Sequence, residues 1–286
     1  MAGAARAKGG ARLKLRTLQL SCVGALLALI PLVAPAADLV FSVTEGVTYQ
    51  ATPKEIRDKF EPLAQALGSA LKRNVRVVLV PKYNEVRAGL AKQEYDLAFI
   101  HPAHVALAEV KAGRYKTLAW TAGYTEYTVS LMVKATDTAK GIADIKGRKL
   151  VTPDPDSITA WMVRAMLRAS KFGPDDVKIV TTRYQDAVPF YLEHGFADVG
   201  ATAANTVVKE WTDKGGKVFL KSRPVPIKYF IVSTKVPADE QERIQHALLS
   251  LAQTEPGRQV LGAIGYKGFV PPDPAVDASA IDWLGL

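Results

Sequence analysis

Cysteine is almost absent from this 286-residue chain, and the single one, Cys22, lies within the first 37 residues. The rest of the chain therefore forms no disulfide, and cysteine nucleophiles are excluded there. The sequence also lacks the Gly-x-Ser-x-Gly pattern of hydrolases, the P-loop, and the Gly-x-Gly-x-x-Gly pattern of dinucleotide-binding enzymes. We expect a protein that is not an enzyme and needs no cofactor.

Acidic residues are missing from the first 37 positions, which carry five basic ones instead. An apolar run over 23–33 follows, and then Ala34-Pro35-Ala36. This order is typical of a cleaved secretory signal peptide, and the apolar run is short for a membrane span. Because the run follows Cys22 rather than preceding it, we do not expect a lipid anchor. The sequence predicts a signal peptide over 1–37, cleavage after Ala36 or Ala37, and a periplasmic location.

A strong charge of either sign is absent from the remaining chain. The formal net charge is +9, and removing the five basic residues of the signal leaves +4. No basic run with interleaved aromatic residues is present, so we expect no nucleic-acid partner. A chain of roughly 250 residues buries a large core as one domain or as two lobes.

Short β-rich runs alternate with helical patterns along this remainder, which favours an α/β fold with parallel-rich sheets flanked by helices. Pro62 is expected to kink the first helix or to begin a second segment. The expected strands are Leu39–Val43, Arg76–Val80, Asp96–Ile100, Thr117–Ala122, Val129–Val133, Arg148–Val151, Val177–Val180, Asp198–Ala201, Lys217–Leu220 and Lys228–Thr234. The expected helices are 56–71, Asn84–Lys92, Pro102–Lys111, Thr159–Lys171, Tyr184–Glu193, Asn205–Trp211 and Ala238–Gln253.

The alternation starts afresh after residue 133, which favours two lobes over one very wide sheet. We expect lobe I to comprise 38–127 plus 229–286 and lobe II to comprise 128–228, with extended crossovers near 124–131 and 226–233. Ligands of such sheets bind outside the carboxyl ends of the strands. The sequence thus predicts a cleft between the lobes.

The junction between the strand at 148–151 and the next helix is a candidate anion site. It reads Thr-Pro-Asp-Pro-Asp-Ser-Ile-Thr-Ala over 152–160. The first-turn N–H groups of a helix have no intrahelical partner, and the helix dipole favours negative charge there. Ser157 and Thr159 are therefore candidate ligand contacts, although both residue types are also ordinary helix caps.

Three further motifs resemble a known family in their order and spacing. They are Phe60-Glu61-Pro62-Leu63-Ala64-Gln65-Ala66-Leu67, Tyr95-Asp96-Leu97-Ala98-Phe99-Ile100-His101-Pro102 and Gly265-Tyr266-Lys267-Gly268-Phe269-Val270. Together they resemble the phosphate/phosphite/phosphonate-binding periplasmic proteins of ABC transporters. The resemblance implies the two-lobed type II periplasmic binding protein fold. It also implies a small anionic ligand such as a phosphonate, the transmembrane subunits of an ABC permease as partners, and a monomer.

Two positions depart from the family pattern. The family's anion loop usually reads Ser-Thr-Ser-Gly, where this chain has Ser157-Ile158-Thr159-Ala160. The family also tends to place a histidine where this chain has Tyr184. Both changes remove a donor or alter its charge, so another anion, an organic acid or a nitrogenous solute stays open as the ligand. A ligand-sensing domain that docks on a sensor protein stays open as an alternative function.

Eight residues are the expected ligand contacts, drawn from the carboxyl ends of strands, the outward crossover and the anion loop. His101 is expected to be a hydrogen-bond donor, whereas His104 is expected to be structural. The two histidines have no third partner that would complete a metal site. The expected contacts are Tyr49, His101, Tyr127, Ser157, Ile158, Thr159, Tyr184 and Asn205.

Overall fold

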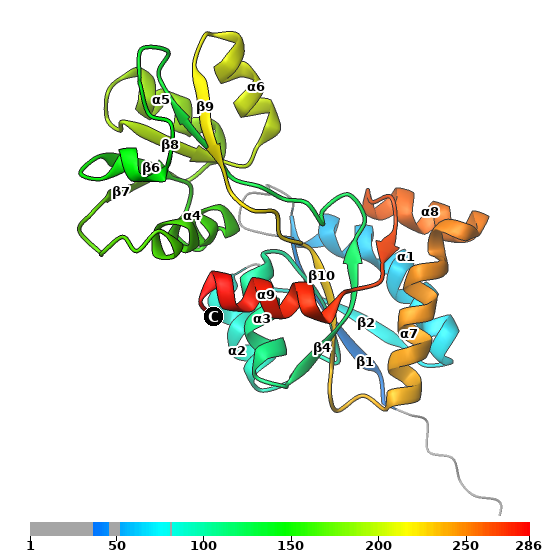
Figure 1. The fold of residues 1–286 in the computed structure, drawn as a ribbon. Coiled ribbons are helices and arrows are strands. Elements are labelled where there is room, and N and C mark those ends of the chain that lie inside the picture. Colours follow the sequence, from blue (N-terminus) through cyan, green and yellow to red (C-terminus); the bar gives the residue numbers. More distant parts are fainter. Residues whose placement is uncertain (1–36, 46–51, 81) are drawn as a thin grey trace, which may run out of the picture. The chain divides into compact units, whose positions relative to one another are not determined.

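The computed structural model describes residues 37–45, 52–80 and 82–286 (Figure 1). The predicted signal peptide falls outside these residues except for Ala37. Within the described ranges, no helix has both the length and the hydropathy needed to cross a bilayer. Two separate sheets organise this part of the chain.

The first sheet has six strands in the order β11-β4-β10-β3-β1-β2. Its strands are β1 (Leu39–Thr44), β2 (Val75–Leu79), β3 (Leu97–Ile100), β4 (Tyr115–Thr121), β10 (Tyr229–Ser233) and β11 (Phe269–Val270). The helices that connect or follow these strands are α1 (Pro53–Leu71), α2 (Tyr83–Ala91), α3 (Ala103–Lys111), α7 (Ala238–Ser250), α8 (Glu255–Ile264) and α9 (Pro274–Leu284), and η3 (Leu251–Gln253) is a 3-10 turn.

Both faces of the first sheet are buried. Along β3, Leu97 and Phe99 pack into one apolar cluster with residues of α1, α7 and α8. The alternate residues Ala98 and Ile100 pack into a second cluster with residues of α2, α3 and α9. Since successive side chains of a strand point to opposite faces, the unbroken apolar run of β3 is what a doubly covered strand requires.

The second sheet has five strands in the order β7-β6-β8-β5-β9. Residues of α4 pack in the same cluster as Leu131 and Leu150, whereas residues of α5 and α6 pack with Met132 and Val151. The strands are β5 (Ser130–Val133), β6 (Lys149–Thr152), β7 (Lys178–Thr181), β8 (Val199–Thr202) and β9 (Lys217–Lys221). The helices are α4 (Ile158–Ala169), α5 (Val188–Glu193) and α6 (Asn205–Asp213), with 3-10 turns η1 (Ile142–Ile145) and η2 (Gln185–Ala187).

Both sheets are mixed, with parallel and antiparallel pairs, and helices flank them as expected. β1 pairs in parallel with β2 and β3, and β6 pairs in parallel with β7 and β8. β10 is antiparallel to β3 and β4, and β5 is antiparallel to β8 and β9. β11 is likewise antiparallel to β4. The reversed strands β5 and β10 each follow one of the two crossovers, so the chain enters the sheet from the opposite end at these strands.

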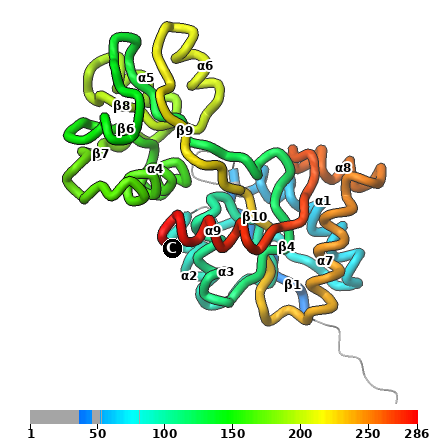
Figure 2. Tube along the Cα trace, in the orientation of Figure 1, coloured from blue at the N-terminus to red at the C-terminus, as the bar shows by residue number. Residues whose placement is uncertain are grey.

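The two crossovers run alongside each other (Figure 2), and Tyr127 forms an isolated antiparallel bridge with Val225 between them. The chain passes from β4 to β5 in one crossover and from β9 to β10 in the other. The two crossovers occur along the chain where the sequence predicts them, near 124–131 and 226–233. The residue limits of the two lobes stay a prediction.

Every predicted strand is present, to within two residues at either end. α1 is one helix from Pro53 to Leu71 and contains Pro62, so the expected second segment is wrong. An interior proline costs about 3 kcal/mol. Fully buried Phe60 and Leu63 flank it and anchor the helix to the sheet. The predicted helix 184–193 is divided into η2 and α5, and α8, β11 and α9 were not predicted.

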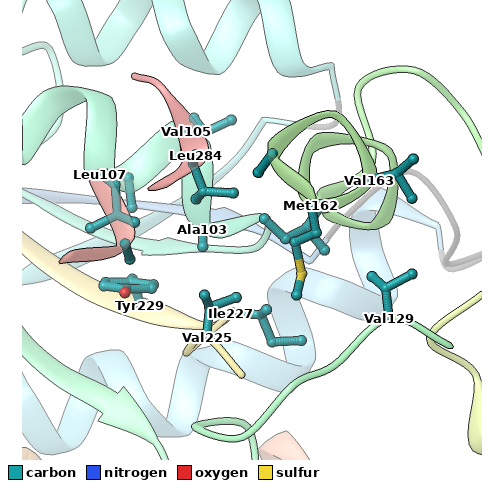
Figure 3. Packing of buried hydrophobic residues seen from close by; sticks show 14 of the residues in the cluster. Ala103, Val105, Leu107, Val129, Met162, Val163, Val225, Ile227, Tyr229 and Leu284 are labelled. Atoms are coloured by element: carbon teal, nitrogen blue, oxygen red, sulfur yellow. The ribbon is translucent and has the colours of Figure 1, made fainter. Parts of the chain in front are cut away.

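One apolar cluster includes residues of both sheets. Figure 3 shows Met162 and Val163 on α4, Leu284 on α9, and Val225 and Ile227 on the return crossover. The core therefore continues from the first sheet, through the crossovers, to the second sheet.

Candidate ligand-binding site

The amino end of α4 follows directly from the carboxyl end of β6 through a loop that is tied down internally. The Ser157 N–H donates to the Asp154 carbonyl at 2.8 Å, and the Asp156 N–H donates to the Asp154 carboxylate at 2.8 Å. Ser157 is the N-cap residue, and its hydroxyl accepts from the Ala160 N–H at 3.1 Å. The N–H groups of Ile158 and Thr159 lie in the first turn, where no intrahelical acceptor exists, at the positive end of the helix dipole.

Thr159 and Tyr127 join α4 to the outward crossover. Their hydroxyl oxygens are 3.2 Å apart, and Thr159 is only 1% exposed. The backbone of Tyr127 is fixed by two hydrogen bonds with Val225, at 3.2 and 3.0 Å. Burial raises the pKa of the Tyr127 phenol, while side-chain hydrogen bonds with Thr159 and Gln185 oppose that shift. Tyr127 thus stays a protonated donor at neutral pH.

Gln185 is a residue of this region that the sequence analysis did not single out. Its side-chain oxygen accepts from the Thr202 hydroxyl at 3.0 Å and from the Ala203 N–H at 2.6 Å. These bonds hold the carboxyl end of β8 against η2. The sequence signal that could have identified Gln185 is its position next to Tyr184, at the start of the predicted helix 184–193.

His101 lies at the carboxyl end of β3, before a cis peptide bond to Pro102. Its Nδ1 lies 3.1 Å from the Ile227 carbonyl oxygen. A carbonyl oxygen only accepts, so Nδ1 carries the proton and donates it there. Burial, reinforced by repulsion from Lys228, lowers the pKa of His101 to about 4. A neutral His101 therefore offers Nε2 only as an acceptor, which does not suit the expected role as a donor to an anion.

A buried ionic network lies at the same edge of the first sheet. The Lys228 ammonium group donates to the Tyr266 hydroxyl at 2.7 Å, and that hydroxyl donates to the Glu45 carboxylate. Lys59 also donates to Glu45, at 2.7 Å. Burial lowers the pKa of Lys228 to about 8. The sequence analysis did not predict this cluster. The one sequence feature that indicates it is Lys228, a charged residue at the start of an apolar strand.

The remaining expected contacts differ in exposure. Ile158 is 3% exposed and belongs to the apolar core, so its side chain packs inward and only its backbone remains at the helix terminus. Tyr184 is half-buried beneath the Arg183 guanidinium, 5.1 Å from its ring centroid. Asn205 is exposed as the first residue of α6, and Ala204 holds the N-cap position. Tyr49 lies outside the described residues.

The structure therefore brings together Ser157, Thr159 and Tyr127, while their contact with a ligand stays a prediction, as it does for the other expected residues. His104 is buried, as expected of a structural residue, at 2% exposure. Among the residues that the structure describes, no group of three or more histidine, cysteine or acidic side chains is arranged to hold a metal ion.

Comparison with known proteins identifies the family. Residues 46–276 match the profile of the phosphonate ABC transporter periplasmic substrate-binding proteins. No curated protein sequence matches the chain.

Solved structures share the fold at low sequence identity. The Xanthomonas citri protein XAC2383, bound to ATP, is 14% identical with a TM-score of 0.70, covering 87% of this chain and 96% of its own. PhnD1 from Prochlorococcus marinus, in complex with methylphosphonate, is 13% identical with a TM-score of 0.63, covering 86% and 96%. The periplasmic aliphatic sulphonate binding protein SsuA from Escherichia coli is 14% identical with a TM-score of 0.51, covering 86% and 78%.

These similarities show the type II periplasmic binding protein fold, which agrees with the two mixed sheets and paired crossovers. The family match spans well over half of the sequence. The chain therefore belongs to the periplasmic substrate-binding proteins of phosphonate ABC transporters.

Proposed function

We propose that this protein binds a small organic oxyanion, a phosphonate or the similarly shaped sulfonate, and delivers it to the transmembrane subunits of an ABC permease. Family membership supports the transport role. PhnD1 in complex with methylphosphonate and the sulphonate binding protein SsuA share its fold, which supports the choice of ligand class. The observation that carries the proposal is the amino end of α4, where Thr159 meets Tyr127.

The chemistry of an oxyanion suits this helix terminus. Three oxygens carry the negative charge and only accept hydrogen bonds, and the first turn of α4 offers N–H groups that have no intrahelical acceptor. One of the Thr159 and Tyr127 hydroxyls donates to the other, and the hydroxyl that accepts in this pair adds one neutral donor for the anion. A hydrogen bond to a charged group contributes about 1.5–3 kcal/mol, so three such bonds at the upper end of that range reach the ~8.2 kcal/mol of a micromolar Kd.

Closure of the lobes around the ligand completes the proposed cycle. Tyr127 lies on a crossover and contacts α4, so the anion and the hinge share one residue. A ligand that contacts both lobes binds the closed state better than the open state and shifts the population toward it. The permease then recognises the closed form. In this proposal the protein acts as a monomer, has no catalytic step and has no nucleic-acid partner.

Calorimetry and thermal unfolding of the protein purified from the periplasm test the proposal. We expect methylphosphonate or methanesulfonate, at a hundred times its Kd, to stabilise the protein by about 2.7 kcal/mol and raise its Tm. Thr159→Val keeps the side-chain shape but loses the hydroxyl, and should weaken binding by roughly tenfold. Thr212→Val, on the exposed face of α6, is the matched control and should leave affinity unchanged. If no phosphonate or sulfonate raises the Tm, the proposed ligand class is wrong.

A further inference from the structure

His104 of α3 and Trp161 of α4 form a stacked pair between helices that belong to different sheets. Their ring centroids are 4.6 Å apart, and the ring planes are inclined by only 16°. His104 is 2% exposed. Neither residue was expected to contact the ligand, yet Trp161 lies in the first turn of α4, beside the candidate anion site.

Each ring of this pair carries a buried nitrogen without a hydrogen-bond partner among the described residues: Nδ1 of His104 and Nε1 of Trp161. Buried polar atoms in native proteins are nearly always paired, because an unpaired one forfeits its bonds to water. Two such atoms on one stacked pair are therefore an observation that a bound partner would explain.

Both unpaired nitrogens are donors. An indole nitrogen only donates. The Nε2 of His104 lies 3.3 Å from the Arg87 guanidinium, which has no acceptor atom, so Nε2 accepts. Burial, together with repulsion from Arg87 and Arg164, lowers the pKa of His104 to about 2 and keeps the ring neutral. The single ring proton is therefore on Nδ1, and the missing partner of both nitrogens is an acceptor.

The charges around the pair favour an acceptor that is itself negative. The Arg164 guanidinium lies 4.9 Å from the centroid of the Trp161 ring. Arg87 pairs with the Asp156 carboxylate at 3.2 Å. The charged groups beside the neutral ring pair are thus two guanidinium groups and one carboxylate, so their net charge is positive.

The stacked pair also lies on the correct side of the helix terminus. Side chains on a helix lean toward its amino end, so the Trp161 ring lies over the turn that precedes its own Cα. The residue of that turn on the same helix face is Ser157, four positions before Trp161, whereas Thr159, two positions before it, faces the other way. An oxyanion held by the first turn would therefore direct its substituent toward the ring pair.

We propose that His104 and Trp161 form a second subsite of the ligand site, which binds an oxygen acceptor on the organic substituent of the oxyanion. The ligand class is then an acid with two acceptor groups, such as a carboxylate-bearing phosphonate, rather than a simple alkylphosphonate. This inference rests on the proposed function and specifies its substrate.

A ligand pair measures the subsite directly. Phosphonoacetate carries a carboxylate beyond its phosphonate, whereas methylphosphonate carries no second acceptor. We expect calorimetry to give an affinity at least about tenfold higher for phosphonoacetate. Trp161→Phe and His104→Phe retain the stack without the donors, and each should remove most of that preference while changing the methylphosphonate affinity by less than about twofold. Trp283→Phe, on α9, is the control and should preserve the preference.

Nuclear magnetic resonance of the unmodified protein avoids dependence on the folding of the variants. The Nε1–H resonance of Trp161 should shift when phosphonoacetate is added and stay in place when methylphosphonate is added. The indole of Trp211, which donates to the Val133 carbonyl at 3.0 Å, provides a reference resonance. Equal affinity for the two ligands with an unmoved Trp161 resonance would overturn the subsite and leave the proposed function intact. Failure of both ligands to bind would instead contradict the proposed function.

Discussion

At the scale of single residues, the two histidines after β3 have the clearest electrostatic consequence. Burial is the main reason why the pKa of His101 falls to about 4 and that of His104 to about 2. Nearby cations reinforce both shifts: Lys228 acts on His101, and Arg87 and Arg164 act on His104. The folded protein therefore binds fewer protons than the unfolded chain below pH 6.5.

This difference predicts acid sensitivity. Stability contributed by a group with a depressed pKa is present above its unfolded pKa of about 6.5 and is lost as the pH falls toward the folded value. Between pH 6.5 and 5, each histidine should lower the free energy of unfolding by about 1.5 kcal/mol. Urea titrations at several pH values measure this slope.

Substitution of His104 tests the source of this acid sensitivity, and a substitution at an exposed site away from both buried histidines is the control. His104→Phe should roughly halve the loss of stability over this pH range, whereas Thr212→Val, at an exposed site, should leave it unchanged. An unaltered slope in His104→Phe would show that His104 is not the source of the acid sensitivity.

At the scale of single elements, α8 shows how one backbone contact fixes a helix. A Cβ atom at Gly257 would lie 2.0 Å from the carbonyl oxygen of Leu251 in η3. The same helix contains Gly262, where an added Cβ would meet nothing within 4 Å. The two glycines share an element but differ in what surrounds them.

Alanine substitutions at the two glycines should have opposite signs. Gly257→Ala should destabilise the protein by about 1–3 kcal/mol, because the backbone of η3 must move to relieve the overlap. Gly262→Ala should stabilise it by about 0.5–1 kcal/mol, because alanine reduces the entropy of the unfolded chain within a helix. Paired thermal unfolding curves measure both effects. Similar changes in Tm for the two variants would contradict the close approach of α8 to η3.

At the scale of the whole molecule, the apolar core does not divide along the two sheets. One cluster contains Leu90 and Ile100 from the first sheet and its helices, and Leu150 and Met162 from the second. Val225 and Ile227 of the return crossover belong to the same cluster. Unfolding either sheet alone would expose apolar surface of the other.

The shared core predicts cooperative unfolding in a single transition. Trp120 on β4 reports on the first sheet, and Trp211 on α6 reports on the second. Because the chain has four tryptophans, the probes are two variants in which Trp120 or Trp211 is the single one retained. In each variant, tryptophan fluorescence and far-UV circular dichroism should give the same midpoint urea concentration. Different midpoints for the two probes, or a plateau between two transitions, would indicate that the sheets unfold independently.

Much of the candidate site follows from local sequence. The hydroxyl-rich turn after β6 is recognisable because Ser157 and Thr159 precede a clear helical pattern, and the structure places the helix start there. The role of Ile158 was less accessible, since only the packed structure shows its side chain turned into the core. His101 was recognised by position, but its bond to the Ile227 carbonyl depends on a segment 126 residues away.

The sequence by itself determined the order of strands and helices, the anion-binding turn and the family resemblance, because these depend on periodicity and on residues that are neighbours along the chain. Tertiary structure alone decided the reversed directions of β5 and β10, the ionic network of Lys228 and the stacking of His104 on Trp161. These features join segments distant in the sequence. Their energies come from burial and from pairing across elements, and no local pattern records either one.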